Sequence, residues 1–551
     1  MSHPLFDKHR ATLDGALNAI RARGFWSPYP EIPKAYGETA MADGKAAFDA
    51  HLNRRFALGQ AGEKTWVATE ESPYGVDLGV SYPVSDAGAL LDAGIAAMSA
   101  WRKLGAEGRV GVCLEILDRI NKRSFEMSHA VMLTSGQGWA MAFQAGGPHA
   151  QDRGLEAVAY AWQEMSQVPA EATWEKPQGK NPPLVMRKHF EIVGRGVSLV
   201  IGCSTFPTWN SYPGLFAALA TGNAVIVKPH PNAILPVAIT VQIVRDVLQE
   251  NGVPPDLVTL CVDPDPAITQ RLATHPAVKS VDYTGGNAFG SWLLENCRQA
   301  QVYAEMAGVN NVVIDSTDNY KGLLKNLAFT LSLYSGQMCT TTQVLIVPSD
   351  GIGTPEGRVP FDRVAADLGG AIDNFLSDPA VAAAVLGAIN SEATLKRIEE
   401  APKWGDVVLT SRKIEHPDFP KAQVRSPVLL KTNAANEKGY MEERFGPISF
   451  VVKAKDAGDA VALSERIVQQ KGALTVGLYS TSQDVIDAMT EATLRAGVAL
   501  SLNLTSGVYV NQSAGFSDYH GTGANPAANA SYTDSAFVAN RFRVVQRRYH
   551  V

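Results

Sequence analysis

The pattern of apolar positions changes character along the chain. Between about residues 86 and 168, apolar residues recur every three to four positions, which predicts amphipathic helices. From residue 197 onward, unbroken apolar runs of strand length alternate with helical stretches. Continuously apolar strands separated by helices predict a parallel sheet covered on both faces, a doubly wound α/β domain. The strand-like runs lie at 197–203, 223–229, 257–262, 278–285 and 301–306.

The rest of the chain divides into three further patterns. Residues 309 to about 504 again alternate strands and helices, which predicts a second α/β domain. Residues 176–194 combine proline punctuation with short alternation, which predicts an exposed hairpin, and residues 542–551 cluster apolar side chains in a terminal edge strand. Residues 1–70 are rich in aromatics and prolines without a clear period and are predicted to be an extension over the larger body.

Composition narrows the class of protein. The 551 residues carry 49 Lys+Arg against 55 Asp+Glu, a net charge of −6, with 46% hydrophobic and 19% charged residues. These values are typical of a globular enzyme and offer no basic surface for nucleic acid or an anionic membrane. No apolar run reaches 18 residues and the N-terminus lacks the apolar core of a signal peptide, so we expect a cytoplasmic protein that does not contact the membrane.

Cys339 is the candidate nucleophile among five cysteines. Five is an odd number without zinc-ligand spacing, so we expect free thiols and no metal site. A single cysteine is more often a small buried hydrophobe. Cys339, however, follows a helical pattern at the start of a loop of small polar residues, where a thiol can be activated. Glu305 ends the predicted strand at 301–306, at the edge of the sheet where ligands bind, and lies 34 positions before Cys339.

At this point five motifs resemble the aldehyde dehydrogenase superfamily over about residues 71–545. They occur in family order and comprise Lys228 in GNAVIVKP, Thr284-Gly285-Gly286, Glu305-Met306-Ala307-Gly308, Gly336-Gln337-Met338-Cys339, and Glu443, Phe445, Gly446 and Pro447 in EERFGPISF.

The resemblance implies a two-stage reaction. Cys339 attacks an aldehyde carbon, the resulting thiohemiacetal passes a hydride to a nicotinamide, and a thioester remains on the sulfur. Glu305 then acts as general base for the water that hydrolyses this thioester to an acid.

The sequence departs from the family pattern at the oxyanion hole, which stabilises the negative oxygen of the thiohemiacetal. The family places an asparagine amide 23 residues before the cofactor lysine, and here that position is Thr205. Because of this spacing, Thr205 is the first candidate donor. Its hydroxyl can donate one hydrogen bond but has a shorter reach than an amide. Asn210, five residues later, is the second candidate, facing the substrate tunnel or replacing the lost amide.

The cofactor motif also departs from the family pattern. The resemblance implies that Lys228 and Ser204 bind the cofactor, and that Thr284, Gly285, Gly286, Glu443 and Phe445 contact its nicotinamide end. The glutamate that often binds the adenosine ribose three residues after the lysine is replaced by Pro231. Losing a carboxylate removes repulsion against a 2′-phosphate, and Lys228 or His230 could pair with one. We therefore expect NADP, with NAD as the alternative. The glycines that many family members carry before the next helix are replaced by Asp263-Pro264-Asp265, which implies different pyrophosphate contacts, although a turn and a helix N-cap is the favoured interpretation of the two aspartates.

The resemblance assigns a role to each part of the chain. It implies a cofactor domain at 71–175 and 195–306, a catalytic domain at 307–510, and an oligomerisation hairpin and strand at 176–194 and 511–551, beside the extension at 1–70. The small β flap implies a homodimer or homotetramer.

The segments at 202–216 and 525–548 resemble a branch of the family that acts in aerobic phenylacetate degradation. That branch implies a ring-opened, CoA-linked semialdehyde as substrate and a separate enoyl-CoA-hydratase-like enzyme. Three alternatives stay open: a CoA-acylating aldehyde dehydrogenase, one of broad specificity, and a weakly catalytic member that binds nucleotide.

Overall fold

Five parallel strands form the first sheet of the computed structural model, which describes residues 3–263 and 265–551. Their order is β7-β6-β5-β8-β9, so the chain starts in the middle and winds outward in both directions. This arrangement confirms the doubly wound prediction and puts a topological switch point, the usual place of a ligand, between β5 and β8. The strands are β5 (Val197–Ile201), β6 (Ala224–Lys228), β7 (Val258–Leu260), β8 (Val278–Thr284) and β9 (Gln301–Glu305).

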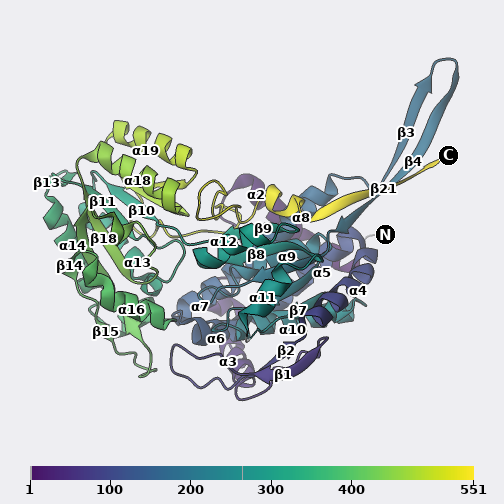
Figure 1. Cartoon of the computed structure of the whole chain (residues 1–551), viewed down its shortest axis with the longest axis horizontal. Helices are drawn as coiled ribbons and strands as arrows, with labels where there is room; N and C mark the ends of the chain where they lie inside the picture. Colours follow the sequence, from purple (N-terminus) through teal and green to yellow (C-terminus); the bar gives the residue numbers. More distant parts are fainter. Residues whose placement is uncertain (1–2, 264) are drawn as a thin grey trace.

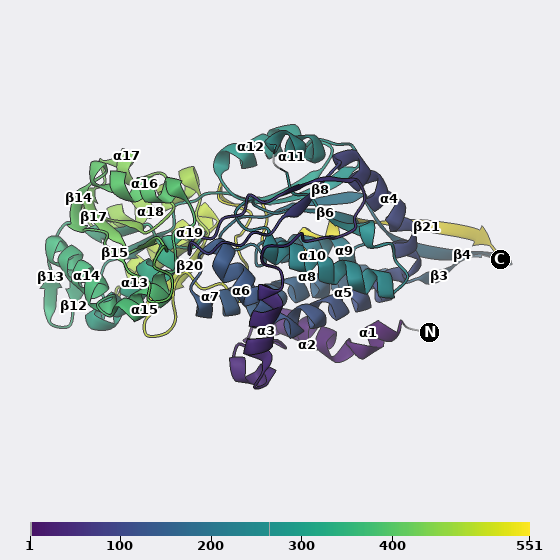
Figure 2. The same cartoon turned by 90° about the horizontal axis from the view of Figure 1, so that it is seen from below.

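Helices cover both faces of this sheet (Figure 2). The predicted helical region before β5 is confirmed, because α4 to α8 follow one another there. The helices of this lobe are α4 (Ala87–Lys103), α5 (Gly105–Lys122), α6 (Ser124–Ser135), α7 (Trp139–Gly146), α8 (Pro148–Ser166), α9 (Ser211–Ala220), α10 (Leu235–Glu250), α11 (Pro266–Ala273) and α12 (Asn287–Asn296), with a 3₁₀ turn at Pro255–Leu257.

A second lobe contains a seven-stranded sheet in the order β14-β17-β18-β11-β10-β19-β20 (Figure 1). All neighbouring strands are parallel except β14 and β17, which confirms the second α/β unit. The strands are β10 (Asn311–Ile314), β11 (Val344–Pro348), β14 (Asp406–Leu409), β17 (Val428–Asn433), β18 (Ile448–Ala454), β19 (Thr475–Tyr479) and β20 (Ala499–Leu502). The helices are α13 (Tyr320–Ser332), α14 (Phe361–Phe375), α15 (Pro379–Leu386), α16 (Glu392–Glu400), α17 (Glu437–Tyr440), α18 (Ala457–Lys471) and α19 (Gln483–Ala496).

Smaller elements complete this lobe. Two short antiparallel pairs lie on it, and 3₁₀ turns follow two of its helices. They are β12 (Ile352–Thr354) with β13 (Gly357–Val359), β15 (Lys413–Ile414) with β16 (Val424–Arg425), and the turns Leu333–Gly336 and Ala401–Lys403.

The predicted hairpin projects from the first lobe and pairs with the C-terminal strand (Figure 1). It consists of β3 (Glu171–Gln178) and β4 (Asn181–Gly194), and β21 (Phe542–His550) follows the short helix α20 (Ser535–Ala539). The sheet order is β21-β4-β3, so β21 pairs with β4 of the same chain, and its other edge has no strand partner among the residues that the structure describes. The hairpin begins five residues earlier than expected, because the alternation of Ala172 and Trp174 with polar residues also belongs to β3.

The N-terminal extension is folded against the first lobe. Its elements are α1 (Pro4–Lys8), α2 (Arg10–Ala22), a 3₁₀ turn at Pro33–Tyr36, α3 (Ala40–Asp49) and β1 (Glu63–Val67), which pairs with β2 (Tyr82–Ser85). The Gln60 side chain donates to the carbonyl oxygen of Leu260 at 2.7 Å and accepts from its N–H at 2.9 Å, so it extends the edge of β7. Glu70 accepts from the backbone N–H groups of Ile234 and Leu235 at the start of α10. Among the described residues, no helix is long and apolar enough to cross a membrane.

Glu70 makes the stability of this contact depend on pH. Burial raises its pKa to about 7, although hydrogen bonds from Tyr82 and the α10 backbone oppose the shift. The folded state therefore holds this proton more tightly than the unfolded state, and stability is lost as pH rises from about 4.5 to 7. Because a glutamine keeps the acceptor oxygen without the charge, Glu70→Gln should stabilise the protein increasingly between pH 5 and 8, by up to about 3 kcal/mol.

Thermal unfolding at pH 5, 6, 7 and 8 measures this effect. The neighbouring Glu71→Gln is the matched control, because Glu71 is exposed. An equal shift of Tm at all four pH values in Glu70→Gln would contradict the prediction.

Candidate active site

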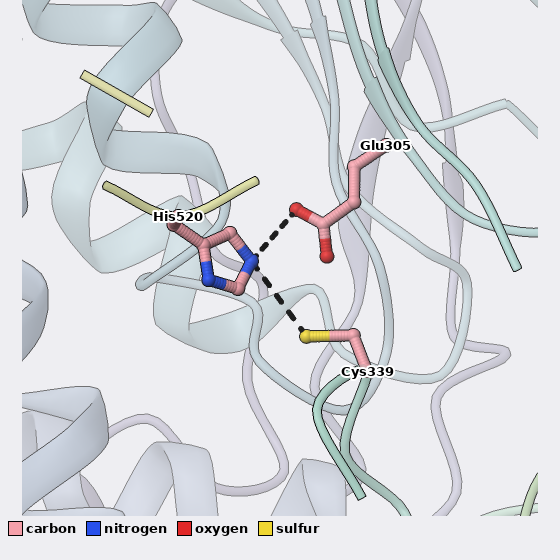
Figure 3. Close-up of side chains that lie close together, drawn as sticks. All are labelled: Glu305, Cys339 and His520. Carbon is pink, nitrogen blue, oxygen red and sulfur yellow. Dashed lines mark hydrogen bonds and ion pairs between the residues drawn. The ribbon is translucent and has the colours of Figure 1, made fainter. Parts of the chain in front are cut away.

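Three side chains from distant parts of the chain meet where the two lobes adjoin: Glu305, Cys339 and His520 (Figure 3). The Nε2 atom of His520 lies 3.1 Å from Oε2 of Glu305 and 3.8 Å from Sγ of Cys339. These side-chain atoms all lie within 4.8 Å of one another. The structure therefore brings together the two predicted catalytic residues and adds a histidine that the sequence analysis did not select.

Backbone contacts with two neighbouring segments hold Glu305 in place. It is the last residue of β9, and its carbonyl oxygen accepts from the N–H of Gly285 at 3.1 Å. The C-terminal segment crosses the same strand, where Glu305 and Ala528 form an antiparallel bridge and Asn529 bonds to the Ala304 and Val302 backbone. The carboxylate thus projects from the carboxyl end of a buried parallel sheet, while the side chain itself is 3% exposed.

Cys339 lies in a tightly constrained loop before β11. Tyr334, Ser335 and Gly336 all have positive φ, and a Cβ on Gly336 would lie 2.3 Å from the Gly446 carbonyl oxygen, so only glycine fits there. The Asn310 amide then donates to the Cys339 carbonyl oxygen at 2.7 Å and accepts from the N–H of Leu474 at 2.9 Å. Asn310 precedes β10, so the nucleophile lies at the amino edge of the second sheet, facing the carboxyl edge of the first.

His520 is held by a buried arginine. Arg153 on α8 is 0% exposed, pairs with Glu156 at 2.8 Å and donates to the Asp518 carbonyl oxygen at 3.0 Å. His520 itself exchanges two backbone hydrogen bonds with Tyr532, each at 2.9 Å. Trp209 contacts the edge of its imidazole, with 4.6 Å between ring centroids. These contacts fix the ring although it lies in a loop.

The charge states of the cluster differ between its members. Burial opposes ionisation of Glu305, but the charge and hydrogen bond of His520 outweigh it, so the pKa of Glu305 is lowered. Burial, followed by the charge of Glu305, raises the pKa of Cys339 well above that of a free thiol. The resting site thus contains a carboxylate base beside a protonated thiol, so the thiol must lose a proton before it can act as a nucleophile.

The structure distinguishes the two candidate oxyanion donors. Asn210 precedes α9, and its Nδ2 lies 3.4 Å from Oε2 of Glu305 and 3.4 Å from Oγ1 of Thr284. The Thr205 hydroxyl instead points to the sulfur of Cys203 at 4.0 Å. Asn210 therefore lies beside Glu305 in the cluster, and its amide is the better placed of the two to replace the family's asparagine amide, which this chain lacks.

We expect Asn210→Ala to lower kcat by about 100-fold, because one oxyanion-hole donor contributes a factor of about 10²–10³. The matched variant Thr205→Val should change kcat by less than about threefold, since it removes only a weak bond to sulfur. Steady-state kinetics at saturating aldehyde measure both variants. The reverse order of effects would return the oxyanion role to Thr205.

At the predicted cofactor end, Lys228 ends β6 and its Nζ lies 3.2 Å from Oδ1 of Asp263, which follows β7. Oδ2 of Asp263 accepts a hydrogen bond from the Thr269 hydroxyl. Asp265, in contrast, caps α11 by accepting from Ala267 N–H at 3.0 Å. The two aspartates therefore differ: Asp265 caps a helix, and Asp263 forms an ion pair with Lys228, the lysine predicted to bind the cofactor.

His230 does not add positive charge at this end. Burial, followed by the charge of Lys228, lowers its pKa to about 4, so its imidazole is neutral at neutral pH. Its Nδ1 accepts from the Asn232 N–H at 3.1 Å. Ser204 is half-buried in the loop after β5. Among Lys228, His230 and Ser204, only Lys228 carries a positive charge, and Asp263 already pairs with it.

The residues predicted for the nicotinamide end lie close to the nucleophile loop. Glu443 and Phe445 line a small cavity with Gly336 and Met338. Burial raises the pKa of Glu443 to about 7, although a hydrogen bond from the Gly308 backbone opposes the shift. On the other side, the segment Thr284–Gly286 leads from β8 into α12, and a Cβ on Gly286 would meet no atom within 4 Å. This open space permits the close backbone approach expected of that glycine.

Two residues at the site, Asn310 and His520, were not selected from the sequence. Asn310 directly precedes an apolar strand. A buried amide at that position needs backbone hydrogen-bond partners, so the sequence did contain a signal that this asparagine holds a neighbouring loop. His520 lies in the glycine-containing loop 513–523, which has no periodicity, so no pattern placed it near Glu305.

A two-lobed α/β fold that holds a cysteine thiol beside a buried carboxylate is typical of thiol-dependent enzymes. The family model "Aldehyde dehydrogenase family" matches residues 81–530, and the chain belongs to this family. It is an aldehyde dehydrogenase, an oxidoreductase.

Three comparisons add detail. The chain is similar to the crystal structure of an NAD-dependent aldehyde dehydrogenase from Burkholderia multivorans, with 55% identity over 100% of both chains and a TM-score of 0.99. It is 22% identical to 1-pyrroline-5-carboxylate dehydrogenase from Bacillus subtilis, covering 78% of this chain and 82% of that protein. It is also 26% identical to a probable acylating methylmalonate-semialdehyde/malonate-semialdehyde dehydrogenase from Drosophila pseudoobscura pseudoobscura, covering 48% of this chain and 50% of that protein.

Proposed function

We propose that this enzyme oxidises an aldehyde to a carboxylic acid through a thioester on Cys339 that water hydrolyses. The observation that carries the proposal is the buried Glu305 carboxylate beside the Cys339 thiol. The sulfur attacks the aldehyde carbon, and the Asn210 amide and the backbone N–H of Cys339 stabilise the resulting oxyanion. A bound nicotinamide cofactor supplies the hydride acceptor for the oxidation.

Glu305 supports water, rather than CoA, as the acceptor of the acyl group. Its lowered pKa keeps it ionised at neutral pH, as a general base must be. One carboxylate oxygen, Oε1, is buried and has no hydrogen-bond partner among the described residues, so it can accept a proton from water. An acylating reaction, which the name of the Drosophila relative describes, would not need this base.

The substrate that we propose is the ring-opened semialdehyde 3-oxo-5,6-dehydrosuberyl-CoA semialdehyde of phenylacetate degradation. The support is the resemblance of residues 202–216 and 525–548 to the phenylacetic acid degradation protein PaaN. One residue of each segment lies near the site: Asn210 of the first beside Glu305, and Tyr532 of the second beside His520. A separate hydratase-like enzyme would then supply the ring-opened substrate.

For the cofactor, the structure gives a reason to favour NAD over the NADP expected from Pro231. The donor set fits a nicotinamide dinucleotide, because an acidic residue at a strand end is the usual partner of the adenosine ribose hydroxyls. Asp263 occupies such a strand end and neutralises Lys228, and His230 is uncharged, so no excess positive charge remains for a 2′-phosphate. The similar structure from Burkholderia multivorans carries the description NAD-dependent.

Asp263→Asn should therefore shift the preference toward NADP. Removing the carboxylate frees Lys228 to pair with a phosphate. We expect the ratio of kcat/KM for NADP to that for NAD to rise by at least about 10-fold, because the variant gains one pairing of opposite charges with the 2′-phosphate. Asp265→Asn is the matched control, because Asp265 only caps α11. An unchanged ratio in Asp263→Asn would remove Asp263 from cofactor selection.

We also propose that the chain assembles into a homodimer or homotetramer through the three-stranded flap. Val544, Val545 and Tyr549 are exposed on β21, whose outer edge has no strand partner among the described residues. An open strand edge with apolar side chains favours pairing with another sheet. Sedimentation of the purified protein at assay concentration tests this proposal.

The decisive experiment is a turnover assay with NAD or NADP and a panel of aldehydes, with and without free CoA. Formation of a carboxylic acid at the same rate in both conditions supports the hydrolytic reaction. An acyl-CoA product that requires added CoA would replace it with the acylating reaction. A preference for CoA-linked semialdehydes over simple aldehydes of equal length supports the proposed substrate.

A further inference from the structure

The imidazole of His520 contacts both Glu305 and Cys339, and the packing of its loop alone does not require this position. It is 4% exposed, and its Nε2 atom faces both reacting groups, with Glu305 Oε2 at 3.1 Å and Cys339 Sγ at 3.8 Å (Figure 3). An ionised carboxylate is an acceptor only, so the hydrogen bond to Glu305 places a proton on Nε2. The same N–H group also lies beside the sulfur.

We propose that His520 is a catalytic residue that completes a Cys339–His520–Glu305 triad, in which its Nε2–H group fixes one oxygen of Glu305 and stabilises the Cys339 thiolate. This inference deepens the proposed function and rests on Cys339 being the nucleophile.

The proton of the Cys339 thiol moves to Glu305. The S–H bond of Cys339 breaks, and its proton forms an O–H bond on Glu305, whose Oε1 has no hydrogen-bond partner among the described residues. Glu305 passes this proton on to solvent water before hydrolysis, so that it is again a carboxylate when it acts as general base. The electron pair left on sulfur then forms the bond to the aldehyde carbon. His520 keeps its own proton throughout and offers it as a hydrogen bond to the thiolate, as donors next to reactive cysteines do.

The surroundings of the imidazole leave this role to His520. Trp209 packs against its edge and Tyr532 stacks beside it at 6.0 Å, so neither ring competes for Nε2. Burial, then the charge of Glu305, raises the pKa of Tyr532, so that phenol stays neutral. The guanidinium of Arg153 on α8 lies 5.2 Å from the Trp209 ring, and its hydrogen bonds go to Glu156 and the 513–532 segment.

The remaining groups that face the thiol carry no stabilising charge. Glu305, Cys203 and Glu443 each raise the pKa of Cys339 when ionised, after the larger effect of burial. Without a hydrogen-bond donor, the thiolate would be buried next to a carboxylate, which is strongly unfavourable. The Nε2–H group of His520 is thus the side-chain donor that the structure places against this sulfur.

The test is the rate at which iodoacetamide alkylates Cys339 between pH 5.5 and 10, measured by peptide mass spectrometry without aldehyde or cofactor. In His520→Gln, the side-chain amide can still donate to Glu305 but no longer offers the ring N–H group to the sulfur. We expect alkylation at pH 7 to slow at least about 10-fold, with the thiol titration midpoint moving up by about one pH unit. The matched control His189→Gln, on the exposed hairpin, should match the wild type.

The outcomes separate the triad from a structural role and from the proposed function. A structural histidine would lower Tm and leave the thiol midpoint unchanged, and that result would overturn the triad. A shifted midpoint in His520→Gln with normal Tm supports it. Because alkylation needs no aldehyde, a shifted midpoint in a protein that oxidises no aldehyde keeps the triad and rejects the proposed function. If the wild type oxidises aldehydes but the thiol midpoint of His520→Gln is unshifted, the proposed function is kept and the triad is rejected.

Discussion

Cys339→Ser is expected to lower aldehyde oxidation by at least about 1,000-fold, because removing an essential nucleophile leaves only binding and oxyanion stabilisation. A serine hydroxyl is nearly isosteric, yet its pKa is far above that of a thiol, and the buried carboxylate Glu305 beside it opposes its ionisation further. The fold should be unaffected, since the loop is held through the Cys339 carbonyl oxygen by Asn310 and not through the sulfur.

Initial rates of cofactor reduction measure this loss, and cofactor titration by fluorescence checks that binding is kept within about twofold, a difference of about 0.4 kcal/mol. Cys297→Ser is the control, because Cys297 is buried at the end of α12, away from the catalytic cluster. If Cys339→Ser retained a tenth of the wild-type rate, the thioester route would be excluded.

The second large effect is expected in Glu305→Gln, where hydrolysis of the thioester should slow by about 10²–10³-fold. Acylation should suffer less, since removing the carboxylate charge also removes a cause of the raised Cys339 pKa and so partly offsets the loss of the base. The variant should therefore show a burst of cofactor reduction close to one equivalent per active site, followed by slow turnover.

Intact-protein mass spectrometry during the slow phase should detect an acyl group on Cys339. Glu250→Gln, an exposed partner of Arg119 on the far end of α10, serves as the control. Slow turnover with no burst and no acyl adduct would assign Glu305 to the first chemical step alone, and the hydrolytic proposal would lose its base.

The sequence was sufficient for those parts of the site that have a local signal. Cys339 follows a predicted helix at a loop, Glu305 ends an apolar strand, and their spacing matched a family pattern. Both lobes were predictable because continuously apolar strands between amphipathic helices have few other solutions. The family resemblance selected Glu443 and Phe445 for the nicotinamide end of the cofactor, and both line a small cavity with Gly336 and Met338 of the nucleophile loop.

What the sequence could not reveal depends on contacts between distant segments. His520 reaches Glu305 only because Arg153 and Tyr532 hold a loop without periodicity. The spacing to Lys228 singled out Thr205, yet the turn that leads into α9 directs Asn210 to the cluster. Asp263 could be recognised as the partner of Lys228 only once β6 and β7 were known to be neighbours.

The segment that crosses β9 has a consequence for the order in which the enzyme forms during synthesis. Residues 527–529 bond to the outer edge of β9, more than 200 residues after that strand in the chain. While a ribosome makes the intervening second lobe, this edge of the first sheet has no partner, and an unpaired strand edge is a site of misassembly. Vectorial synthesis therefore leaves the nascent chain unprotected at the strand that carries Glu305 until residues 527–529 emerge.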